Sequence, residues 1–264
     1  SNRGFIAVSA GGAHGLGLKS DGSVVAWGDN SKGQCDVPSP NSGFVAIAAG
    51  VRHSLGLKSD GSIVAWGETK SLPQDNSGFV ALSAGYGFSL GLKTDGSIVA
   101  WGSNNLYKQL SVPLPNCNFT AVAAGENSSL GLKADGSIVA WGETSLKGLS
   151  TNTGFVAIAA GEDHNLGLKA DGSILEWDSY GQQHSGPLPN SGYVAVALGE
   201  SYSGTYSLAL APQGALQVTL APPEAIATGA RWRLKDEEPV AWHNDTVYDP
   251  VTQTSGTVLK SRIG

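Results

Sequence analysis

The chain has 264 residues, of which 41% are hydrophobic and only 14% are charged, and 37 are glycines. This composition indicates a globular, turn-rich β protein and excludes a disordered chain. The formal net charge of −6 argues against nucleic acid as a partner, because such a surface needs clustered Lys and Arg. No apolar run approaches the roughly 18 residues of a membrane span, and Cys35 and Cys117 are expected to be unpaired thiols.

The first predicted elements belong to a repeat that begins at Gly4. Gly-Phe or a close relative recurs six times, and five of the six modules run on to a tryptophan. The tryptophans follow one another at intervals of 35 to 40 residues, at Trp27, Trp66, Trp101, Trp141 and Trp177. A period of this length indicates an array of supersecondary units.

Each module predicts three short strands, as the second module shows. The runs are 44–50 (FVAIAAG), 53–59 (HSLGLKS) and 62–67 (SIVAWG), and each is too short and too interrupted by glycine for a helix. Asp60-Gly61, between the last two runs, is a strong hairpin signal and predicts a type I′ turn. Each module is therefore expected to be a small antiparallel sheet.

Both faces of these predicted sheets are apolar. In the third strand Ile63 and Val64 point to opposite faces, and in the first strand Phe44 and Val45 do the same. A sheet with two apolar faces must be covered on both, which small sheets packed around an axis achieve in a β-propeller. A β-helix ranks second because its coils are usually shorter. Gly56 is expected to leave room for a bulky neighbour, a tryptophan of the same or the next blade.

The fifth module and the chain after it depart from this pattern. Its third strand, 174–178, reads ILEWD, and an unpaired buried carboxylate would be costly there. Glu176 is therefore expected to be exposed or paired, with exposure favoured because the ring is expected to end at this module. After 207–212 the repeat is lost. We expect a propeller domain over 1–212 and a small β appendage over 213–264, in which 216–220 (LQVTL) forms a strand.

The residues that suggest chemistry in these modules have structural explanations. His14, His53 and His164 occupy one position of the repeat, and one histidine per blade cannot form a tetrahedral metal site. The Asp of each Asp-Gly pair can bond the local backbone of its own turn. The sequence contains no nucleophile-elbow, zinc-protease or phosphate-loop motif. We therefore expect a protein that is not an enzyme, with no catalytic residues, no metal and no cofactor.

Strand direction predicts where a binding function is located. If the first strand of a module ascends, the loops after Ala-Gly and after Trp-Gly both lie at its upper end, and the Asp-Gly turn lies at its lower end. The upper loops differ between modules and place aromatic side chains among polar ones, as recognition surfaces do. The candidate residues of this binding face are Arg52, Tyr86, Phe88, Tyr107, Glu126, Glu162, Asp163, Tyr180 and Tyr202, with Glu68 and Glu143 in the same loops.

Two long motifs carry a resemblance to a known family. The runs 30–44 (NSKGQCDVPSPNSGF) and 49–67 (AGVRHSLGLKSDGSIVAWG) resemble the regulator of chromosome condensation repeat, in the compact form found in bacteria. The resemblance covers roughly residues 4–210 and implies an all-β, seven-bladed propeller with about six modules present. The seventh blade is expected to be missing or supplied by sequence before Ser1. The run 214–234 resembles about half of a small β-sandwich repeat of extracellular bacterial proteins.

The resemblance implies a choice of functions. The family includes a nucleotide exchange factor for a small GTPase, a propeller-type β-lactamase inhibitor that binds its target with one face, and secreted or surface repeats. No module here is long enough for the insertion on which exchange activity depends, and the basic chromatin-binding tail is missing. The resemblance therefore favours a protein-binding scaffold, extracellular or on the cell surface, with an unknown protein as partner. A carbohydrate-binding accessory module, with a glycan as partner, is the alternative.

Overall fold

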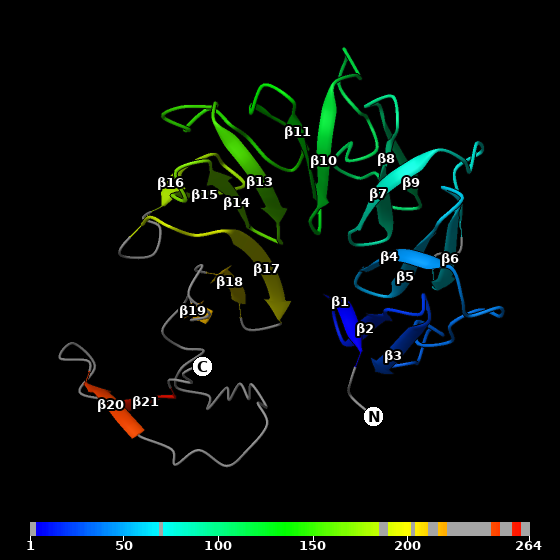
Figure 1. The fold of residues 1–264 in the computed structure, drawn as a ribbon. Coiled ribbons are helices and arrows are strands. Elements are labelled where there is room, and N and C mark those ends of the chain that lie inside the picture. Colours follow the sequence, from blue (N-terminus) through cyan, green and yellow to red (C-terminus); the bar gives the residue numbers. More distant parts are fainter. Residues whose placement is uncertain are drawn as a thin grey trace.

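The computed structural model describes residues 4–68, 71–184, 190–201, 204–210, 216–220, 244–248 and 255–259. Within these ranges the chain forms six antiparallel sheets that follow one another around an axis, as the blades of a propeller do, and one separate two-stranded sheet (Figure 1). The expected all-β propeller is therefore confirmed. The described ranges contain no helix that is long and apolar enough to cross a membrane.

Each blade follows the strand order that the sequence predicts. Blade 1 contains β1 (Phe5–Ala10), β2 (His14–Lys19) and β3 (Val24–Gly28). Blade 2 contains β4 (Phe44–Ala49), β5 (His53–Lys58) and β6 (Ile63–Gly67), and blade 3 contains β7 (Phe79–Ala84), β8 (Phe88–Lys93) and β9 (Ile98–Gly102). Blade 4 contains β10 (Phe119–Ala124), β11 (Ser128–Lys133) and β12 (Ile138–Gly142). The innermost strands contact one another in the order β1, β4, β7, β10 and β13.

Blades 5 and 6 differ from the strand pattern that the sequence predicts. Blade 5 contains β13 (Phe155–Ala160), β14 (His164–Lys169), β15 (Ile174–Asp178) and a short fourth strand, β16 (Gln183–His184). Blade 6 contains β17 (Ala195–Ser201), β18 (Gly204–Leu210) and β19 (Leu216–Leu220). The strand β19 pairs with β18, so it belongs to this sheet and not to the appendage. Of the rest of 213–264, only the hairpin β20 (Asn244–Tyr248) and β21 (Ser255–Leu259) is described, and the expected β-sandwich resemblance lies otherwise outside the described residues.

The expectation that the ring ends at the fifth module was wrong, because blade 6 follows blade 5 and β17 contacts β13. Tyr193 of blade 6 shares a core cluster with Leu166 and Leu168 of blade 5. Asp178, in β15 of blade 5, is half-buried, and its Oδ2 lies 3.2 Å from Nε2 of His184 on the added strand β16. Glu176 is half-buried in the same strand pair, opposite His184. The altered third strand therefore belongs to a blade that has gained a fourth strand.

The Asp-Gly turns have a different geometry from the predicted type I′. Only the glycine has a positive φ, +80° at Gly61, and the Gly61 N–H donates to Lys58 O across Ser59 and Asp60. This is the three-residue hairpin that places a left-handed glycine after an ordinary turn. The Asp60 side chain accepts from both N and Oγ of Ser62, which favours this form because the aspartate is held locally.

A bulge at the start of each blade changes which side chains are covered. The pairing of β4 with β5 shifts register between Phe44 and Ala46, so that Phe44 is buried while Val45 is 52% exposed. The same register shift recurs at the start of β1, β7, β10 and β13. The prediction that both faces of this strand are covered was therefore wrong at the bulged position.

The core lies between blades, as a propeller requires. Leu55, Leu57 and Ile63 of blade 2 pack with Phe79 and Trp101 of blade 3. The predicted core role of the tryptophans is confirmed at Trp66, Trp101, Trp141 and Trp177, which are all buried. The glycine in the second strand has another explanation than the one predicted, because a Cβ at Gly56 would lie 2.4 Å from the ring of Phe44, not against a tryptophan.

Candidate functional site

The two sets of variable loops lie at the same end of every blade, as strand direction predicts. In blade 2 the Glu68 N–H, after Trp-Gly, donates to Arg52 O, after Ala-Gly, at 3.0 Å. The equivalent bonds in the other blades are Asp29 N to Ala13 O, Ser103 N to Gly87 O, Glu143 N to Asn127 O and Ser179 N to Asp163 O. We call this end the variable face, defined by the loops that follow Ala-Gly and Trp-Gly.

The opposite end of the blades is the uniform face, formed by the Asp-Gly turns. Each turn aspartate accepts hydrogen bonds from the serine two residues later, and these bonds hold the carboxyl pKa below its ordinary value. The turn glycine accepts from the next blade, as Gly61 O does from Phe79 N at 3.0 Å. The predicted local role of these aspartates is therefore confirmed, and their polar groups are occupied by the fold.

Most candidate residues of the binding face are exposed on the variable face. Tyr86 is 38% exposed, Tyr107 41% and Tyr180 83%. Arg52, Glu162 and Asp163 are also exposed, and Glu126 is half-buried. The candidate Tyr202 lies outside the described residues.

Phe88 is a correction to the predicted set, because its side chain is completely buried. It begins β8 at the position that His14 and His53 occupy in β2 and β5, and at that position the side chain points into the core. It packs in one cluster with Leu90 and Trp141. Phe88 therefore contributes to the stability of blade 3 and presents no surface to a partner.

The histidines of this position connect neighbouring blades. His14 Nε2 lies 2.8 Å from Ser54 Oγ, and His53 Nε2 lies 3.0 Å from Ser89 Oγ. The structural role predicted for the histidines is confirmed for these two, and the partner of each is a serine of the next blade. Burial lowers the pKa of His14, and it lowers the pKa of His53 to about 4, so both rings are neutral at pH 7. His164 instead packs edge-on against His184, with ring centroids 5.3 Å apart.

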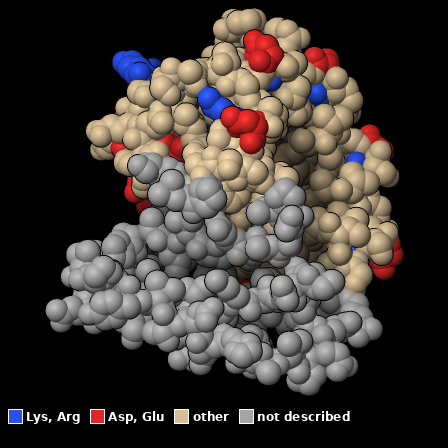
Figure 2. Space-filling view, turned by 60° about the vertical axis from the view of Figure 1, so that its left-hand side comes forward, with Lys and Arg blue, Asp and Glu red and all other residues tan. Residues whose placement is uncertain are grey.

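Acidic side chains gather on the variable face between blades 4 and 5. Burial raises the pKa of the Glu126 carboxyl above its ordinary value, and the negative charge and hydrogen bond of Glu162 raise it further. The charges of Asp163 and Glu143 act in the same direction. On the face seen in Figure 2, Lys and Arg are scattered singly among acidic and uncharged residues, with no continuous basic patch on the described part. The variable face is therefore acidic at this junction.

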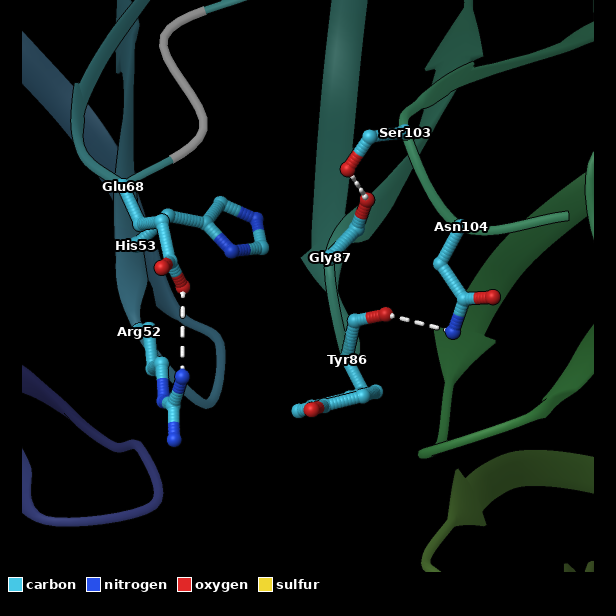
Figure 3. A pocket seen from close by; sticks show the side chains of 7 residues that line it. All are labelled: Arg52, His53, Glu68, Tyr86, Gly87, Ser103 and Asn104. Carbon is cyan, nitrogen blue, oxygen red and sulfur yellow. Dashed lines mark hydrogen bonds and ion pairs between the residues drawn. The ribbon is translucent and has the colours of Figure 1, made fainter.

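A pocket of about 380 Å³ opens on the variable face between blades 2 and 3 (Figure 3). Arg52 and Glu68 form one wall, with Arg52 Nη1 3.7 Å from Glu68 Oε2. Tyr86 and Asn104 lie opposite, and Asn104 Nδ2 donates to Tyr86 O at 3.0 Å. The other lining residues are His53, Gly87 and Ser103. Arg52 and Tyr86 belong to the predicted face, whereas Ser103 and Asn104 were missed because no single module marks them as different from other loop residues.

Comparison with known proteins supports this description of the fold. The regulator of chromosome condensation (RCC1) repeat family matches residues 5–34, 44–70 and 79–109. No curated protein matches the chain in sequence. Yeast RCC1 (Prp20), solved bound to Kap60, is 20% identical with a TM-score of 0.65, and the match covers 81% of this chain and 69% of that one.

Two further solved structures are similar. Prp20p from Saccharomyces cerevisiae, described with its binding properties to Gsp1p and histones, is 22% identical with a TM-score of 0.63, covering 81% of this chain and 71% of that one. The CRINKLY WD40 ectodomain of the Arabidopsis thaliana receptor kinase ACR4 is 22% identical with a TM-score of 0.63, covering 78% and 76%. Residues 5–34, 44–70 and 79–109 therefore match RCC1 repeats, and the six described blades form a propeller similar to those of RCC1 proteins.

Proposed function

We propose that this chain is a non-enzymatic protein-binding propeller whose variable face contacts the partner. The observation that carries the proposal is the difference between its two ends. The polar groups of the uniform face are bonded within the fold, as Asp60 is to Ser62. The variable face instead exposes Tyr86, Tyr107 and Tyr180 among charged residues. Tyrosines in such surroundings supply much of the binding energy of protein interfaces.

The similar structures support a protein as the partner. Yeast RCC1 is described bound to Kap60, and Prp20p is described with binding to Gsp1p and histones. From these proteins we carry over only that a propeller of this type can bind another protein. The partner of this chain is expected to present cationic side chains near Glu162 and Asp163, and apolar or carbonyl groups near the tyrosines.

The test is a triple substitution of Tyr86, Tyr107 and Tyr180 to alanine. Proteins from the organism that encodes the chain would be captured on the wild type, and the complex would be quantified by mass spectrometry. The triple variant is expected to lose at least about 90% of the captured partner, since truncation of central tyrosines typically costs more than 2 kcal/mol. The tyrosines are exposed, so the melting temperature is expected to remain unchanged.

A matched control carries substitutions on the uniform face, Ser59→Ala and Thr94→Ala, both at exposed positions next to Asp-Gly turns. This variant is expected to capture the partner as the wild type does. If the triple variant keeps its partner while the control loses it, the binding surface is the uniform face and the proposal is wrong.

A further inference from the structure

The segments that connect successive blades alternate between long and short. Residues 29–43 connect β3 to β4 and 103–118 connect β9 to β10, whereas the shorter segments 68–78 and 143–154 connect β6 to β7 and β12 to β13. Each of these two long segments contains a buried glutamine, Gln34 in the first and Gln109 in the second. The two kinds of segment therefore fill the junction between blades in different ways.

Gln34 docks between blades 1 and 2 through both its main chain and its side chain. Its carbonyl oxygen accepts from Trp66 Nε1 at 2.8 Å and from Ser54 Oγ at 2.8 Å. Its side-chain Nε2 donates to Asp29 Oδ2 at 2.8 Å. A Cβ placed on Gly67 would lie 3.3 Å from Gln34 Cα, so the docked residue packs directly over the end of β6.

Gln109 docks between blades 3 and 4 in the same way. Its carbonyl oxygen accepts from Trp141 Nε1 at 2.8 Å and from Ser129 Oγ at 3.1 Å. Its side-chain Nε2 has no hydrogen-bond partner among the described residues. The reason is that Ser103 occupies the place after Trp-Gly where Asp29 stands in blade 1. The carboxylate at this place is thus what binds the glutamine amide.

At the junction between blades 2 and 3 the tryptophan donor is also present, and no described residue of the connecting segment, 68 and 71–78, bonds to it. Trp101 is 7% exposed and lies against Phe79 at 6.0 Å and 53°, close to the 6.3 Å and 59° of Trp66 against Phe44. Its buried Nε1 nonetheless has no acceptor within the described ranges. The three atoms nearest to a Cβ placed on Gly102 all belong to blade 3 itself. A buried indole N–H without an acceptor is costly, so this donor favours an incoming carbonyl oxygen.

The pocket between blades 2 and 3 supplies the second group that a glutamine needs. Glu68 lines this pocket directly after Trp-Gly, the place of Asp29 in blade 1. At the junction between blades 4 and 5, Trp177 Nε1 also has no acceptor among the described residues, but there Leu146 and Leu149 of the connecting segment pack against the core cluster of Trp177. The junction between blades 2 and 3 therefore has an open pocket with a carboxylate in its lining, and a buried tryptophan donor without a described acceptor in its core.

We propose that this pocket binds a glutamine residue in a peptide segment of the partner, in the manner in which Gln34 binds within the chain. The main-chain carbonyl of that residue accepts from Trp101 Nε1, and its side-chain amide donates to Glu68. Arg52 and Tyr86 form the outer rim and contact the flanking residues. This inference rests on the proposed function, since it names the partner chemistry of the variable face.

The probe is the heptapeptide of residues 31–37 of this chain, acetylated, amidated and carrying Cys35→Ser. It would be titrated into protein with ¹⁵N-labelled tryptophan indoles, the Trp101 resonance being assigned from Trp101→Phe. A saturable shift of the Trp101 indole resonance is expected. The same peptide with Gln34→Ala is expected to bind at least about tenfold more weakly, because it loses a hydrogen bond to a charged group.

Two protein variants make the test specific. Glu68→Ala is expected to weaken binding of the heptapeptide about tenfold or more, whereas Glu143→Ala, at the equivalent place of blade 4, leaves it unchanged. The inference is wrong if the Trp101 resonance does not move, if both peptides bind equally, or if the two variants behave alike. The titration needs no natural partner, so a negative result contradicts only this inference. The tyrosine experiment tests the proposed function independently.

Discussion

At the scale of single residues, the repeat requires glycine at positions where a larger side chain would overlap a neighbouring ring. The glycine of each second strand is one of them, since a Cβ at Gly56, Gly91 or Gly131 would lie within about 2.5 Å of a phenylalanine ring of the same blade. The sequence predicts that this space is needed but not which residue fills it. The bulge after Phe44 turns that ring over Gly56, and a bulge depends on pairing that strand periodicity does not reveal.

The first prediction concerns this contact. Gly56→Leu is expected to lower the free energy of unfolding by about 1–3 kcal/mol, because the added side chain overlaps the Phe44 ring. Urea denaturation measures the loss, with Val45→Leu as the control at an exposed position of the same blade. Adding Phe44→Ala to Gly56→Leu is expected to cost less than the sum of the single changes. Strict additivity of the two would contradict the proposed contact.

The second prediction concerns the buried histidine at the junction of blades 2 and 3. The pKa of His53 is lowered from 6.5 to about 4 by burial, so the unfolded chain binds a proton at a higher pH than the folded one. Neutral His53 therefore makes its full contribution to the free energy of unfolding above pH 6.5. This contribution decreases as the pH falls towards 4, by up to about 3 kcal/mol in all.

His53→Phe tests this pH dependence, because the chain itself places Phe88 at the same position of blade 3. The variant is expected to show a smaller fall in melting temperature between pH 7 and pH 4 than the wild type. A residual slope is expected from His14, whose pKa burial also lowers. An unchanged slope in the variant would mean that His53 titrates at its ordinary pKa.

At the scale of elements, the strands and their order could be predicted from the sequence because apolar runs, glycines and Asp-Gly pairs recur with the period of the blade. The position of the variable face could be predicted too, since antiparallel order fixes which loops share an end. Phe88 was wrongly predicted to lie on the binding face because it is an aromatic residue next to a variable loop. Its position at the start of β8 points the side chain into the core. The pocket could not be predicted, because it lies between loops of two blades whose packing depends on the short segment that connects them. Trp101 Nε1 and Trp177 Nε1 lack the acceptor that Trp66 and Trp141 have, and the sequence of one module does not show this difference.

The third prediction exchanges one connecting segment for another. Replacing residues 68–78 by the sequence of 29–43 places a glutamine opposite Trp101, where its carbonyl can accept from Trp101 Nε1. The exchange is expected to stabilise the protein by about 1 kcal/mol and to abolish binding of the heptapeptide. Differential scanning calorimetry and the Trp101 indole resonance measure the two effects.

The same exchange at residues 143–154 serves as the matched control. Leu146 and Leu149 already pack on the core in that segment, so their loss is expected to lower the melting temperature. Stabilisation at both places would show that long connections are favourable in themselves, and the specific role given to the glutamine would then be wrong.

At the scale of the whole molecule, the position of a blade in the ring decides what its repeated residues contribute. Trp66, Trp101, Trp141 and Trp177 each pack against the preceding blade and are buried. Trp27 has the same place in blade 1 but is 50% exposed, and no described blade precedes it. Ile6 and Val8 of the same blade are also exposed, at 65% and 73%. The same motif therefore contributes differently to the free energy of unfolding in different blades, and the sequence of a single module cannot show this.

The last prediction compares two tryptophans that occupy the same position in different blades. Trp101→Ala is expected to lower the free energy of unfolding by about 3–5 kcal/mol, because it leaves a cavity in the core cluster that blades 2 and 3 share. Trp27→Ala is expected to cost no more than about 1–2 kcal/mol, since half of its surface already contacts water and little cavity forms. Urea denaturation of both variants, with sedimentation velocity to establish that each is monomeric, measures the difference. If both variants lose the same free energy of unfolding and both are monomers, the outer face of blade 1 is covered in solution. The prediction that the two tryptophans contribute unequally to stability would then be wrong.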